Sequence, residues 1–420
     1  MLSPIRIAYL TALYPAISHT FILREVEGLR ALGLDVETVS TRRPGLEHLR
    51  GATEQSEASE TFYIIESAKK GLTLPLALAM ALGRPHRVLR MLRLAWRTRA
   101  PGLRAALYQF FYFAEAMVLA RHIKARKITH LHSHFAQASA TVAMLAAELA
   151  DVPFSFTLHG PSDFHEPQRW HLSEKIARAV FVSCISHFAR AQGMLFSDST
   201  HWNRMRIVHC GIVPENYRKD DRRESKVGTD ILFVGRLAPV KGLRVLLEAF
   251  AAAREKHPGL RLTIVGDGED RAHLEEMARP MGDAVRFTGY LSQEEVAEAL
   301  ANVDAFVLPS FAEGLPVVLM EALAAGKPAI ASRVAGVAEL IEEGRTGYLI
   351  HAGDVDGLRA ALEMLSADPE AGRALGSAGR AVVTAEFDAR IEAARIARLF
   401  LHGPGEALRP APLCPGEVMG

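Results

Sequence analysis

Two glutamates lie eight positions apart in an otherwise apolar segment, residues 313–332 (EGLPVVLMEALAAGKPAIAS). Pro316 suits the first turn of a helix, so we expect Glu313 in the preceding loop and Glu321 within the helix. A buried carboxylate is costly unless something pairs with it. Its two oxygens can accept parallel hydrogen bonds from the vicinal hydroxyls of a ribose or another sugar. One hypothesis is that Glu321 binds a ligand diol and Glu313 a second sugar; the other is an internal ion pair between Glu321 and Lys327.

A second candidate site lies upstream, at residues 232–242 (LFVGRLAPVKG). The pattern predicts a strand that ends at Gly235 and a helix that begins near Gly242, with Arg236 and Lys241 flanking the short loop. Backbone N–H groups at a helix N-terminus attract phosphate, and an arginine can bind phosphate through two hydrogen bonds. The segment therefore suggests a phosphate site, whereas the plainer interpretation is a pair of solvated surface cations.

A third pattern resembles a dinucleotide site without completing it. Residues 263–270 (TIVGDGED) contain Gly266 and Gly268, but Arg271 stands where the third glycine of G-x-G-x-x-G belongs. We therefore favour a tight turn beneath a nucleotide over a nicotinamide site.

Metal binding has two weak signals. His132 and His134 alternate onto one face of a strand and could chelate an ion, but the sequence offers no evident third ligand. Asp354 and Asp356 form a D-x-D pair, which can hold a divalent cation through oxygen ligands. Asp354 opens a helical pattern, so we predict that it is a helix N-cap. We predict no metal site and no cofactor.

Elements that repeat along the chain must position these residues. Short apolar strands alternate with longer helical segments, which predicts parallel sheets covered on both faces. A chain of 420 residues is long enough for two domains. The alternation of strands and helices begins again after residues 214–229. We interpret this polar and aperiodic stretch as an interdomain linker. Two such halves place a ligand in the cleft between the carboxyl ends of their strands.

The predicted fold class is α/β, with two doubly wound, Rossmann-like domains facing across a cleft. Its segments are an N-terminal domain at 1–213, the linker at 214–229, a second domain at 230–383, a C-terminal helix at 384–402 expected to cross back to the first domain, and a Pro- and Gly-rich tail at 403–420 expected to be disordered.

Composition narrows the classes of function. A net charge of +1 argues against bulk nucleic-acid binding. Three widely spaced cysteines suit a reducing compartment and give neither a disulfide framework nor a zinc cluster. The N-terminus lacks the apolar region of a signal peptide, and no apolar run reaches the ~20 residues of a membrane-spanning helix. We therefore expect a cytoplasmic protein.

One segment departs from this pattern. Residues 67–114 contain no Asp or Glu, and their Lys and Arg are Lys69, Lys70, Arg84, Arg87, Arg90, Arg93, Arg97, Arg99 and Arg104. On a helix, Arg87, Arg90, Arg93 and Arg97 cluster on one face opposite an apolar face. Such a basic insertion suits contact with an anionic membrane; the alternative is a solvated face whose apolar side packs on the N-terminal core.

The motifs together resemble the GT-B glycosyltransferases of family 4. Glu313 and Glu321 match the E-x7-E signature of that family, and residues 233–242 (FVGRLAPVKG) resemble its phosphate loop. The resemblance covers most of the chain and is strongest at residues 231–349. It implies a retaining, metal-independent sugar transfer from a nucleotide diphosphate sugar.

The resemblance implies roles in the second half of the chain. Arg236 and Lys241 hold the diphosphate and stabilise the leaving group, Glu321 binds the ribose, and Glu313 holds sugar hydroxyls. The donor-binding residues that it implies are Gly235, Arg236, Lys241, Gly266, Tyr290, Leu291, Glu313, Gly314, Leu315 and Glu321.

In the first half, residues 158–164 (LHGPSDF) resemble the family's His-Gly-x-x-Asp segment. The resemblance places His159 near the donor sugar, which makes His159, Glu313, Arg236 and Lys241 the implied catalytic set. Residues 14–29 are similar to the first loop of the branch that builds exopolysaccharides such as colanic acid, although His19 stands where glutamate is common. The implied acceptor-binding residues are Ser18, His19, Thr20 and Asp163, and the resemblance places Asp163 near the acceptor or a supporting helix.

The leading interpretation is a hexosyltransferase that extends a lipid-linked oligosaccharide for a surface polysaccharide, such as exopolysaccharide or lipopolysaccharide. Its expected partners are a UDP- or GDP-sugar, a lipid-linked saccharide and the inner face of the cytoplasmic membrane, where it would be a peripheral protein. Two alternatives remain open: a nucleotide-sugar epimerase of GT-B fold, and a non-catalytic sugar-binding module.

Overall fold

The computed structural model describes residues 5–16, 19–49, 51–217, 230–414 and 417 of the chain. The chain divides into two compact units: unit 1 comprises Met1–Cys210 and Ala389–Gly420, and unit 2 comprises Gly211–Asp388. Unit 1 therefore contains residues from both ends of the chain. The sequence suggested divisions after residues 213 and 383, and the units divide after residues 210 and 388.

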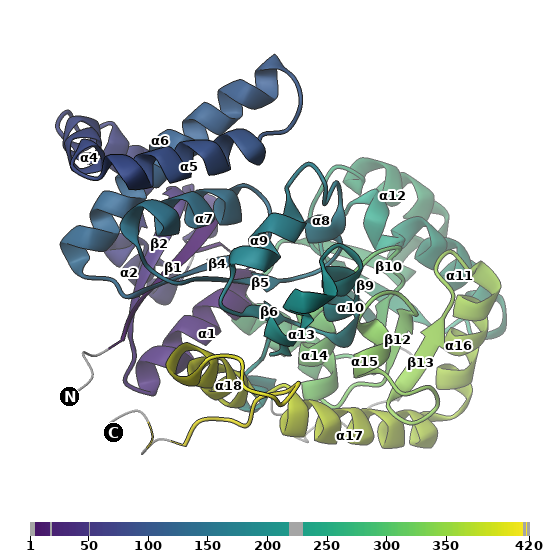
Figure 1. Cartoon of the computed structure of the whole chain (residues 1–420). Coiled ribbons are helices and arrows are strands. Elements are labelled where there is room, and N and C mark those ends of the chain that lie inside the picture. The colour runs from purple at the N-terminus through teal and green to yellow at the C-terminus, as the bar shows by residue number, and fades with distance from the viewer. Residues whose placement is uncertain (1–4, 17–18, 50, 218–229, 415–416, 418–420) are drawn as a thin grey trace. The chain divides into compact units, whose positions relative to one another are not determined.

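Unit 1 is built on a parallel sheet which, within the described residues, has seven strands in the order β3-β2-β1-β4-β5-β6-β7 (Figure 1). The strands are β1 (Arg6–Leu13), β2 (Asp35–Arg42), β3 (Phe62–Tyr63), β4 (His130–His134), β5 (Phe154–Leu158), β6 (Val182–Cys184) and β7 (Met205–Ile207). Every residue of β4 and β5 is buried, as expected for a parallel sheet with helices on both faces.

The helices of unit 1 connect these strands and cover the sheet. They are α1 (Thr20–Ala31), α2 (Ala52–Glu60), α3 (Ile64–Ala68), α4 (Thr73–Leu82), α5 (Pro85–Arg97), α6 (Leu103–Arg126), α7 (Ala138–Ala150), α8 (Pro161–Phe164), α9 (Leu172–Arg178), α10 (His187–Leu195) and α18 (Ala389–His402). Ile396 and Phe400 of α18 share a core with Ile22 and Val26 of α1, and the two helices lie side by side in unit 1.

The tail beyond α18 differs from the expected disorder. Its described residues include 403–414, which are part of unit 1, and Leu413 is buried in the same core. The Leu408 carbonyl accepts a hydrogen bond from Ile207 N at 2.9 Å, and the Arg206 guanidinium donates to the Pro404 and Gly405 carbonyls. The composition suggested disorder because Pro and Gly form no periodic pattern, but one apolar side chain and a series of arginine–carbonyl contacts order the segment.

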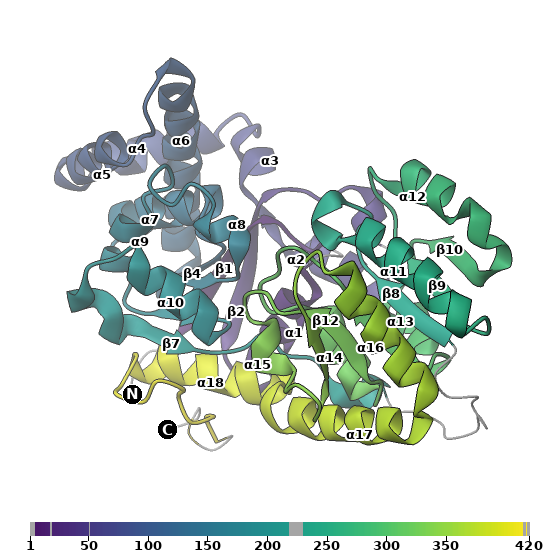
Figure 2. The same ribbon diagram turned by 90° about the vertical axis from the view of Figure 1, so that its right-hand side faces the viewer.

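Unit 2 is built on a second parallel sheet, whose six strands within the described residues follow the order β10-β9-β8-β11-β12-β13 (Figure 2). The strands are β8 (Asp230–Val234), β9 (Arg261–Val265), β10 (Val285–Gly289), β11 (Ala305–Leu308), β12 (Ala329–Ser332) and β13 (Gly347–Ile350). The helices are α11 (Leu243–Lys256), α12 (Arg271–Ala278), α13 (Gln293–Ala301), α14 (Val317–Ala324), α15 (Val337–Leu340), α16 (Val355–Ala367) and α17 (Pro369–Glu386).

Both sheets confirm the predicted doubly wound α/β class. In unit 1 the strand order reverses between β1 and β4, and in unit 2 it reverses between β8 and β11. Loops at the carboxyl ends of the two strands diverge at such a point, which is where ligands bind in this class of sheet. The predicted N-cap is also confirmed, because the Asp354 side chain accepts a hydrogen bond from Gly357 N at 2.8 Å.

The predicted linker is only partly described. Pro214–Tyr217 form a 3₁₀ turn that packs against α14 within unit 2, and Pro214 and Tyr217 are buried. Residues 218–229 lie outside the described residues. The first part of the stretch was therefore wrongly interpreted as linker, because a lone buried tyrosine leaves no periodic signal.

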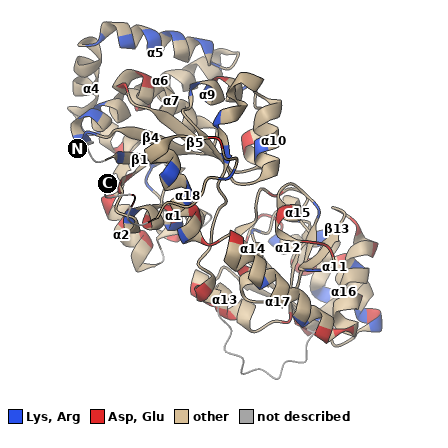
Figure 3. Cartoon of the chain, turned by 60° about the horizontal axis from the view of Figure 1, so that its bottom comes forward, with Lys and Arg blue, Asp and Glu red and all other residues tan. Residues whose placement is uncertain are grey.

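The basic insertion folds as α4, α5 and the N-terminal part of α6, which extend away from the sheet of unit 1 (Figures 1 and 2). Lys and Arg are spread along α5 (Figure 3). Three of its arginines pair with acids on α7 and α9: Arg87 with Asp151 at the end of α7, Arg90 with Glu148, and Arg97 with Glu174. Three arginines of the predicted cationic face therefore lie next to carboxylates of the same unit, although the Arg90 and Arg97 side chains are still 54% and 70% exposed. Contact with a membrane stays a prediction. Among the described residues, no helix has the length and hydropathy to cross a bilayer.

Candidate active site

The loop after β8 is held by close backbone packing on the loop after β9. Gly235 N donates to the Val265 carbonyl at 3.0 Å, and Leu237 N donates to the Asp267 carbonyl at 2.9 Å. A Cβ on Gly266 would lie 1.9 Å from the Gly235 carbonyl oxygen, and Gly266 has a φ of +129°. Only glycine allows this approach. These contacts show that Gly266 allows the two loops to pack closely; its contact with a donor stays a prediction.

The loop after β8 also touches the loop after β11. Phe311 N donates to the Val240 carbonyl at 2.8 Å. A Cβ on Gly242, which has a φ of +68°, would lie 2.1 Å from the Pro309 carbonyl oxygen. The two loops that flank the strand reversal of unit 2 are therefore fixed against each other before any ligand binds.

The loops bring two predicted residues into contact. Lys241 Nζ lies 2.7 Å from Glu313 Oε1, and both side chains are largely shielded from solvent. The same carboxylate oxygen accepts a hydrogen bond from the Ser310 hydroxyl at 2.6 Å. Two donors thus fix the Glu313 carboxylate, and Ser310 is a site residue that the sequence analysis missed. An ammonium has three N–H donors, so Lys241 can remain paired with Glu313 and still donate a hydrogen bond to an anion.

Arg236 differs from Lys241 in its freedom to move. Its side chain is 67% exposed, and its ion-pair contact with Glu269 is long, at 3.8 Å. Such an exposed pair contributes little stability. The Arg236 guanidinium is therefore available for a bidentate contact with an incoming phosphate.

Glu321 has a partner that neither sequence hypothesis included. Tyr217 Oη donates to Glu321 Oε1 at 2.7 Å, and both side chains are buried. Lys327, the alternative partner, instead donates to the Ala301 and Val303 carbonyls. The ion pair between Glu321 and Lys327 was therefore wrong. A tyrosine hydroxyl in this place holds the carboxylate as one hydroxyl of a bound diol would.

The remaining donor residues surround the same edge of the sheet. Tyr290 follows β10 directly and is 46% exposed, with Leu291 half-buried beside it. The Gly314 carbonyl accepts from Gly336 N at 3.0 Å, and the Leu315 side chain is buried. Leu315 therefore offers a ligand its backbone rather than its side chain. Apart from Gly266, the predicted donor residues gather at the carboxyl ends of β8, β10 and β11 or on α14.

In unit 1, His159 follows β5 and packs among aromatic rings. Its ring centroid lies 4.9 Å from that of Phe21 and 4.5 Å from that of Phe135. Its Nε2 lies 2.9 Å from His134 Nδ1, and its Nδ1 lies 3.8 Å from Cys210 Sγ. Burial, and then the neighbouring histidines, lower the pKa of His159 well below its usual value. His159 is thus a neutral imidazole whose two nitrogens both face protein groups.

Asp163 joins two loops of unit 1. Its Oδ1 accepts from Ala136 N at 2.7 Å and its Oδ2 accepts from His159 N at 2.6 Å. Lys175 donates to the Ala136 carbonyl at 2.5 Å. Burial raises the pKa of Asp163 to about 6, although the backbone hydrogen bonds oppose this. The predicted contact between Asp163 and an acceptor is wrong for this fully buried side chain, which instead holds His159 in position.

The predicted acceptor loop is partly described. His19 precedes α1, and its ring centroid lies 5.0 Å from that of Phe135. His19 and Thr20 are half-buried at the carboxyl end of β1, and Ser18 lies outside the described residues. Because Phe135 follows β4, His19 and His159 share one neighbour at the strand reversal of unit 1.

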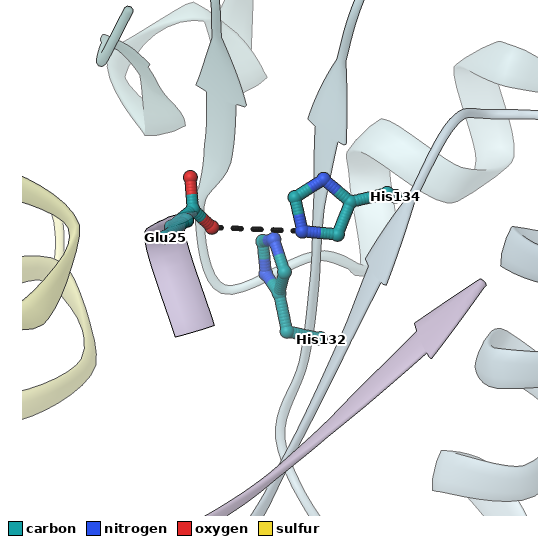
Figure 4. A group of neighbouring side chains, drawn as sticks. All are labelled: Glu25, His132 and His134. Atoms are coloured by element: carbon teal, nitrogen blue, oxygen red, sulfur yellow. Dashed lines mark ion pairs between the residues drawn. The ribbon is translucent and has the colours of Figure 1, made fainter. Parts of the chain in front are cut away.

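A third potential metal ligand joins His132 and His134 in the structure. Glu25 of α1 points toward both histidines (Figure 4), and ligand atoms of the three residues lie within 4.8 Å of one another. However, both nitrogens of His132 already bond to Ser155 and Thr157, at 2.7 and 3.0 Å. Glu25 accepts from Tyr9 Oη at 2.8 Å and lies 3.5 Å from His134 Nε2. The arrangement is that of a buried hydrogen-bonded cluster, and the sequence missed Glu25 because it lies more than a hundred residues from the histidines.

Comparison with known proteins identifies a matching family and two related sequences. The family described as "Glycosyl transferases group 1" matches residues 217–382. Glycogen synthase of Mycobacterium tuberculosis is 30% identical over 287 residues, which cover 65% of this chain and 69% of the relative. The amylovoran biosynthesis glycosyltransferase AmsK of Erwinia amylovora is 28% identical over 418 residues, which cover 94% of this chain and 99% of the relative.

Solved structures show the same fold. Alr3699/HepE of Anabaena, crystallised in complex with UDP, has a TM-score of 0.70 and 17% identity, over 94% of this chain and all of that one. Sucrose-phosphate synthase of Thermosynechococcus elongatus has a TM-score of 0.72 and 19% identity, over 94% and 98% of the two chains. These matches confirm the two-domain GT-B fold that the motifs predicted.

Proposed function

The chain belongs to the group 1 glycosyl transferases, and from this we propose that it transfers a hexose, with retention of configuration, from a nucleotide diphosphate sugar to a lipid-linked saccharide. The E-x7-E spacing of Glu313 and Glu321 supports membership of family 4. The full-length similarity to AmsK supports a place in exopolysaccharide or related surface-polysaccharide synthesis. The proposed location is peripheral, at the inner face of the cytoplasmic membrane.

The observation that carries this proposal is the ion pair between Lys241 and Glu313 at the strand reversal of unit 2. It sets a cation for the diphosphate beside a carboxylate for the sugar hydroxyls. When the bond between the anomeric carbon and the diphosphate breaks, negative charge grows on the departing phosphate. Lys241 and Arg236 are positioned to neutralise that charge. We propose that they do so without a metal ion, and that no cofactor takes part.

The other proposed donor-binding residues would contact the nucleoside part of the donor. Glu321 would bind the ribose hydroxyls, with Tyr217 orienting its carboxylate, and Tyr290 offers an exposed ring near the expected position of the base. A UDP- or GDP-sugar is the proposed donor; the complex of the Anabaena protein with UDP favours testing uridine first. In unit 1, His159, His19 and Thr20 would line the sugar and acceptor side, with Asp163 positioning His159.

The test is a thermal-shift screen without added metal, using UDP, GDP, ADP, their nucleosides and their sugars. A diphosphate at 100 times its Kd adds about 2.7 kcal/mol of apparent stability. A shift with one diphosphate and not with its nucleoside would support the donor site. Turnover of the matching sugar onto lipid-linked saccharides, with the anomeric configuration of the product read by NMR, then tests transfer and retention. An inverted product or turnover without any acceptor would contradict the proposal.

A further inference from the structure

Large apolar side chains are exposed on the part of unit 1 that extends away from its sheet. Within the described residues, the exposed large apolar side chains of α4 to α6 and their connecting turns are Leu72, Leu74, Leu76, Leu78, Leu82, Leu89, Leu92, Trp96, Leu103, Leu107, Tyr108, Phe110 and Phe111. We call this set the α4–α6 apolar surface. Exposed apolar patches of this extent mark a surface that binds something.

On α5 these side chains form one stripe. Leu89, Leu92 and Trp96 recur at i, i+3 and i+7, which places them on one helix face, and Trp96 is 68% exposed. Met91 and Leu94 lie on the opposite, buried face. The helix therefore has two apolar faces, one packed in the protein and one in solvent. A helix that only covered the core of unit 1 would need the packed apolar face but not the one exposed to solvent.

The first turns of α6 repeat the arrangement. Leu103, Leu107, Phe110 and Phe111 recur at i, i+4, i+7 and i+8, and Leu103 is 93% exposed. This is the spacing that normally faces a core. Here it faces outward, on a segment that Figures 1 and 2 show extending away from the sheet.

The charged side chains that residues 67–114 contribute to this surface are all cationic. Residues 67–114 contain no acidic residue. Arg93 lies on α5 beside Leu92 and is exposed, as is Arg104 beside Leu103 on α6. Arg99 lies over the Trp96 ring at 4.0 Å. Exposed apolar stripes bordered by arginines are complementary to a bilayer whose headgroups are anionic.

We propose that the α4–α6 apolar surface inserts into the interface of an anionic lipid bilayer, with Leu89, Leu92 and Trp96 among the acyl chains and Arg93 and Arg104 at the headgroups. This differs from docking by a cationic helix face alone, since acids of unit 1 offset part of the charge of Arg87, Arg90 and Arg97. The inference deepens the proposed function and rests on it, because a lipid-linked acceptor requires the enzyme at a membrane.

The test uses the full chain and vesicles of phosphatidylcholine with and without phosphatidylglycerol. Trp170 and Trp202 are replaced by phenylalanine, so that Trp96 is the remaining tryptophan. With phosphatidylglycerol vesicles, we expect Trp96 emission to shift to the blue and to be quenched by brominated acyl chains. Leu89→Gln with Leu92→Gln should weaken vesicle partitioning by at least about tenfold, because two buried leucines are lost. Leu195→Gln with Met364→Gln, which removes exposed apolar side chains elsewhere, is the matched control and should bind as the unaltered chain does.

Two further measurements separate the outcomes. Arg93→Gln with Arg104→Gln should reduce the preference for anionic vesicles while leaving Trp96 quenching in the fraction that binds. Unquenched Trp96, or equal partitioning of the leucine variant, would overturn the inference, as would a dimer in sedimentation that the leucine variant dissociates. Transfer to a short-chain, water-soluble saccharide acceptor should survive in the leucine variant. If the unaltered chain transfers to that acceptor but does not insert into vesicles, only this inference fails; if the unaltered chain transfers to neither acceptor, the proposed function fails.

Discussion

Lys241 and Glu313 meet at 2.7 Å although 72 residues separate them, because the loops after β8 and β11 converge where the strand order reverses. One residue is suited to a phosphate and the other to a sugar. The proposed donor site therefore contains a pair of opposite charges that hold each other in place.

Removing the cation of this pair should weaken diphosphate binding specifically. We expect Lys241→Met to lower the affinity for the nucleoside diphosphate by about ten- to a hundredfold, because one charge-assisted hydrogen bond is lost. Affinity for the nucleoside should not change. Isothermal titration calorimetry measures both, with Lys256→Met on the exposed end of α11 as the control. A Lys241→Met variant that loses nucleoside and diphosphate binding in equal measure would count against the assignment.

Neutralising Glu313 should affect transfer rather than nucleotide binding. Glu313→Gln keeps the shape that Ser310 and Lys241 contact but removes the charge that orders the sugar hydroxyls. We expect turnover to fall by about a hundredfold or more, with nucleoside diphosphate affinity within a few-fold of the unaltered chain. Steady-state kinetics and calorimetry test this, with Glu275→Gln on α12 as a matched change. Normal turnover in Glu313→Gln would refute the assigned role.

The buried contact between Tyr217 and Glu321 makes a prediction about ribose. The unaltered chain should bind a ribonucleoside diphosphate more tightly than its 2′-deoxy form, and Glu321→Ala should remove that preference. Tyr217→Phe should lower the free energy of unfolding by about 1 kcal/mol, as expected for the loss of one hydrogen bond. Competitive binding of the two nucleotides and denaturant unfolding are the measurements. A deoxy form that binds as tightly as the ribo form from the outset would contradict the role of Glu321.

The close packing of the two loops at Gly266 predicts that two Gly→Ala substitutions lower the free energy of unfolding by different amounts. Gly266→Ala combines a Cβ clash with the Gly235 carbonyl and a φ of +129°, so the free energy of unfolding should fall by about 3 kcal/mol or more. Gly326→Ala, just after α14, also has a positive φ, +70°, but nothing lies within 4 Å of its Cβ, so its cost should be about 1 kcal/mol. Denaturant unfolding compares them, and equal costs would show that the close packing of the two loops is unimportant.

The buried Glu25 cluster predicts a pH dependence of stability. Burial, opposed by the Tyr9 hydrogen bond, raises the pKa of Glu25 from 4.5 to about 7. Between those pH values the folded state binds more protons than the unfolded state, so the free energy of unfolding falls as pH rises. Glu25→Gln cannot titrate. Above pH 7 it should therefore be more stable than the unaltered chain, by on the order of 3 kcal/mol at about 1.4 kcal/mol per pKa unit.

Below pH 4.5, where Glu25 is protonated in both states, the two proteins should be equally stable. Exposed Glu60→Gln is the control and should show no such difference. Chemical denaturation across this range provides the measurement. If the stability gain of Glu25→Gln were the same at every pH, a packing effect would explain it and titration would not.

Much of the fold could be predicted from the sequence because its signals are local. Strand and helix periods, the glycines at strand ends and the Asp354 cap all depend on neighbouring residues. The roles of Glu321 and Glu25 could not be derived in this way, because their partners Tyr217 and His134 lie 104 and 109 positions away. The partners of the α5 arginines could not be derived for the same reason: these acids belong to α7 and α9, and helical periodicity gives no information about contacts between elements.

The hydrogen bond from Ile207 to Leu408 has a practical consequence for anyone preparing this protein. β7 is the last strand of its sheet, and an unpaired outer strand invites association with strands of other molecules. Residues 403–414 run beside it and occupy one of its backbone donors. Trimming the chain after α18, an obvious choice for a Pro- and Gly-rich end, would uncover that strand. We expect the shortened protein to aggregate on concentration, so an affinity tag is better placed at the N-terminus than in exchange for this segment.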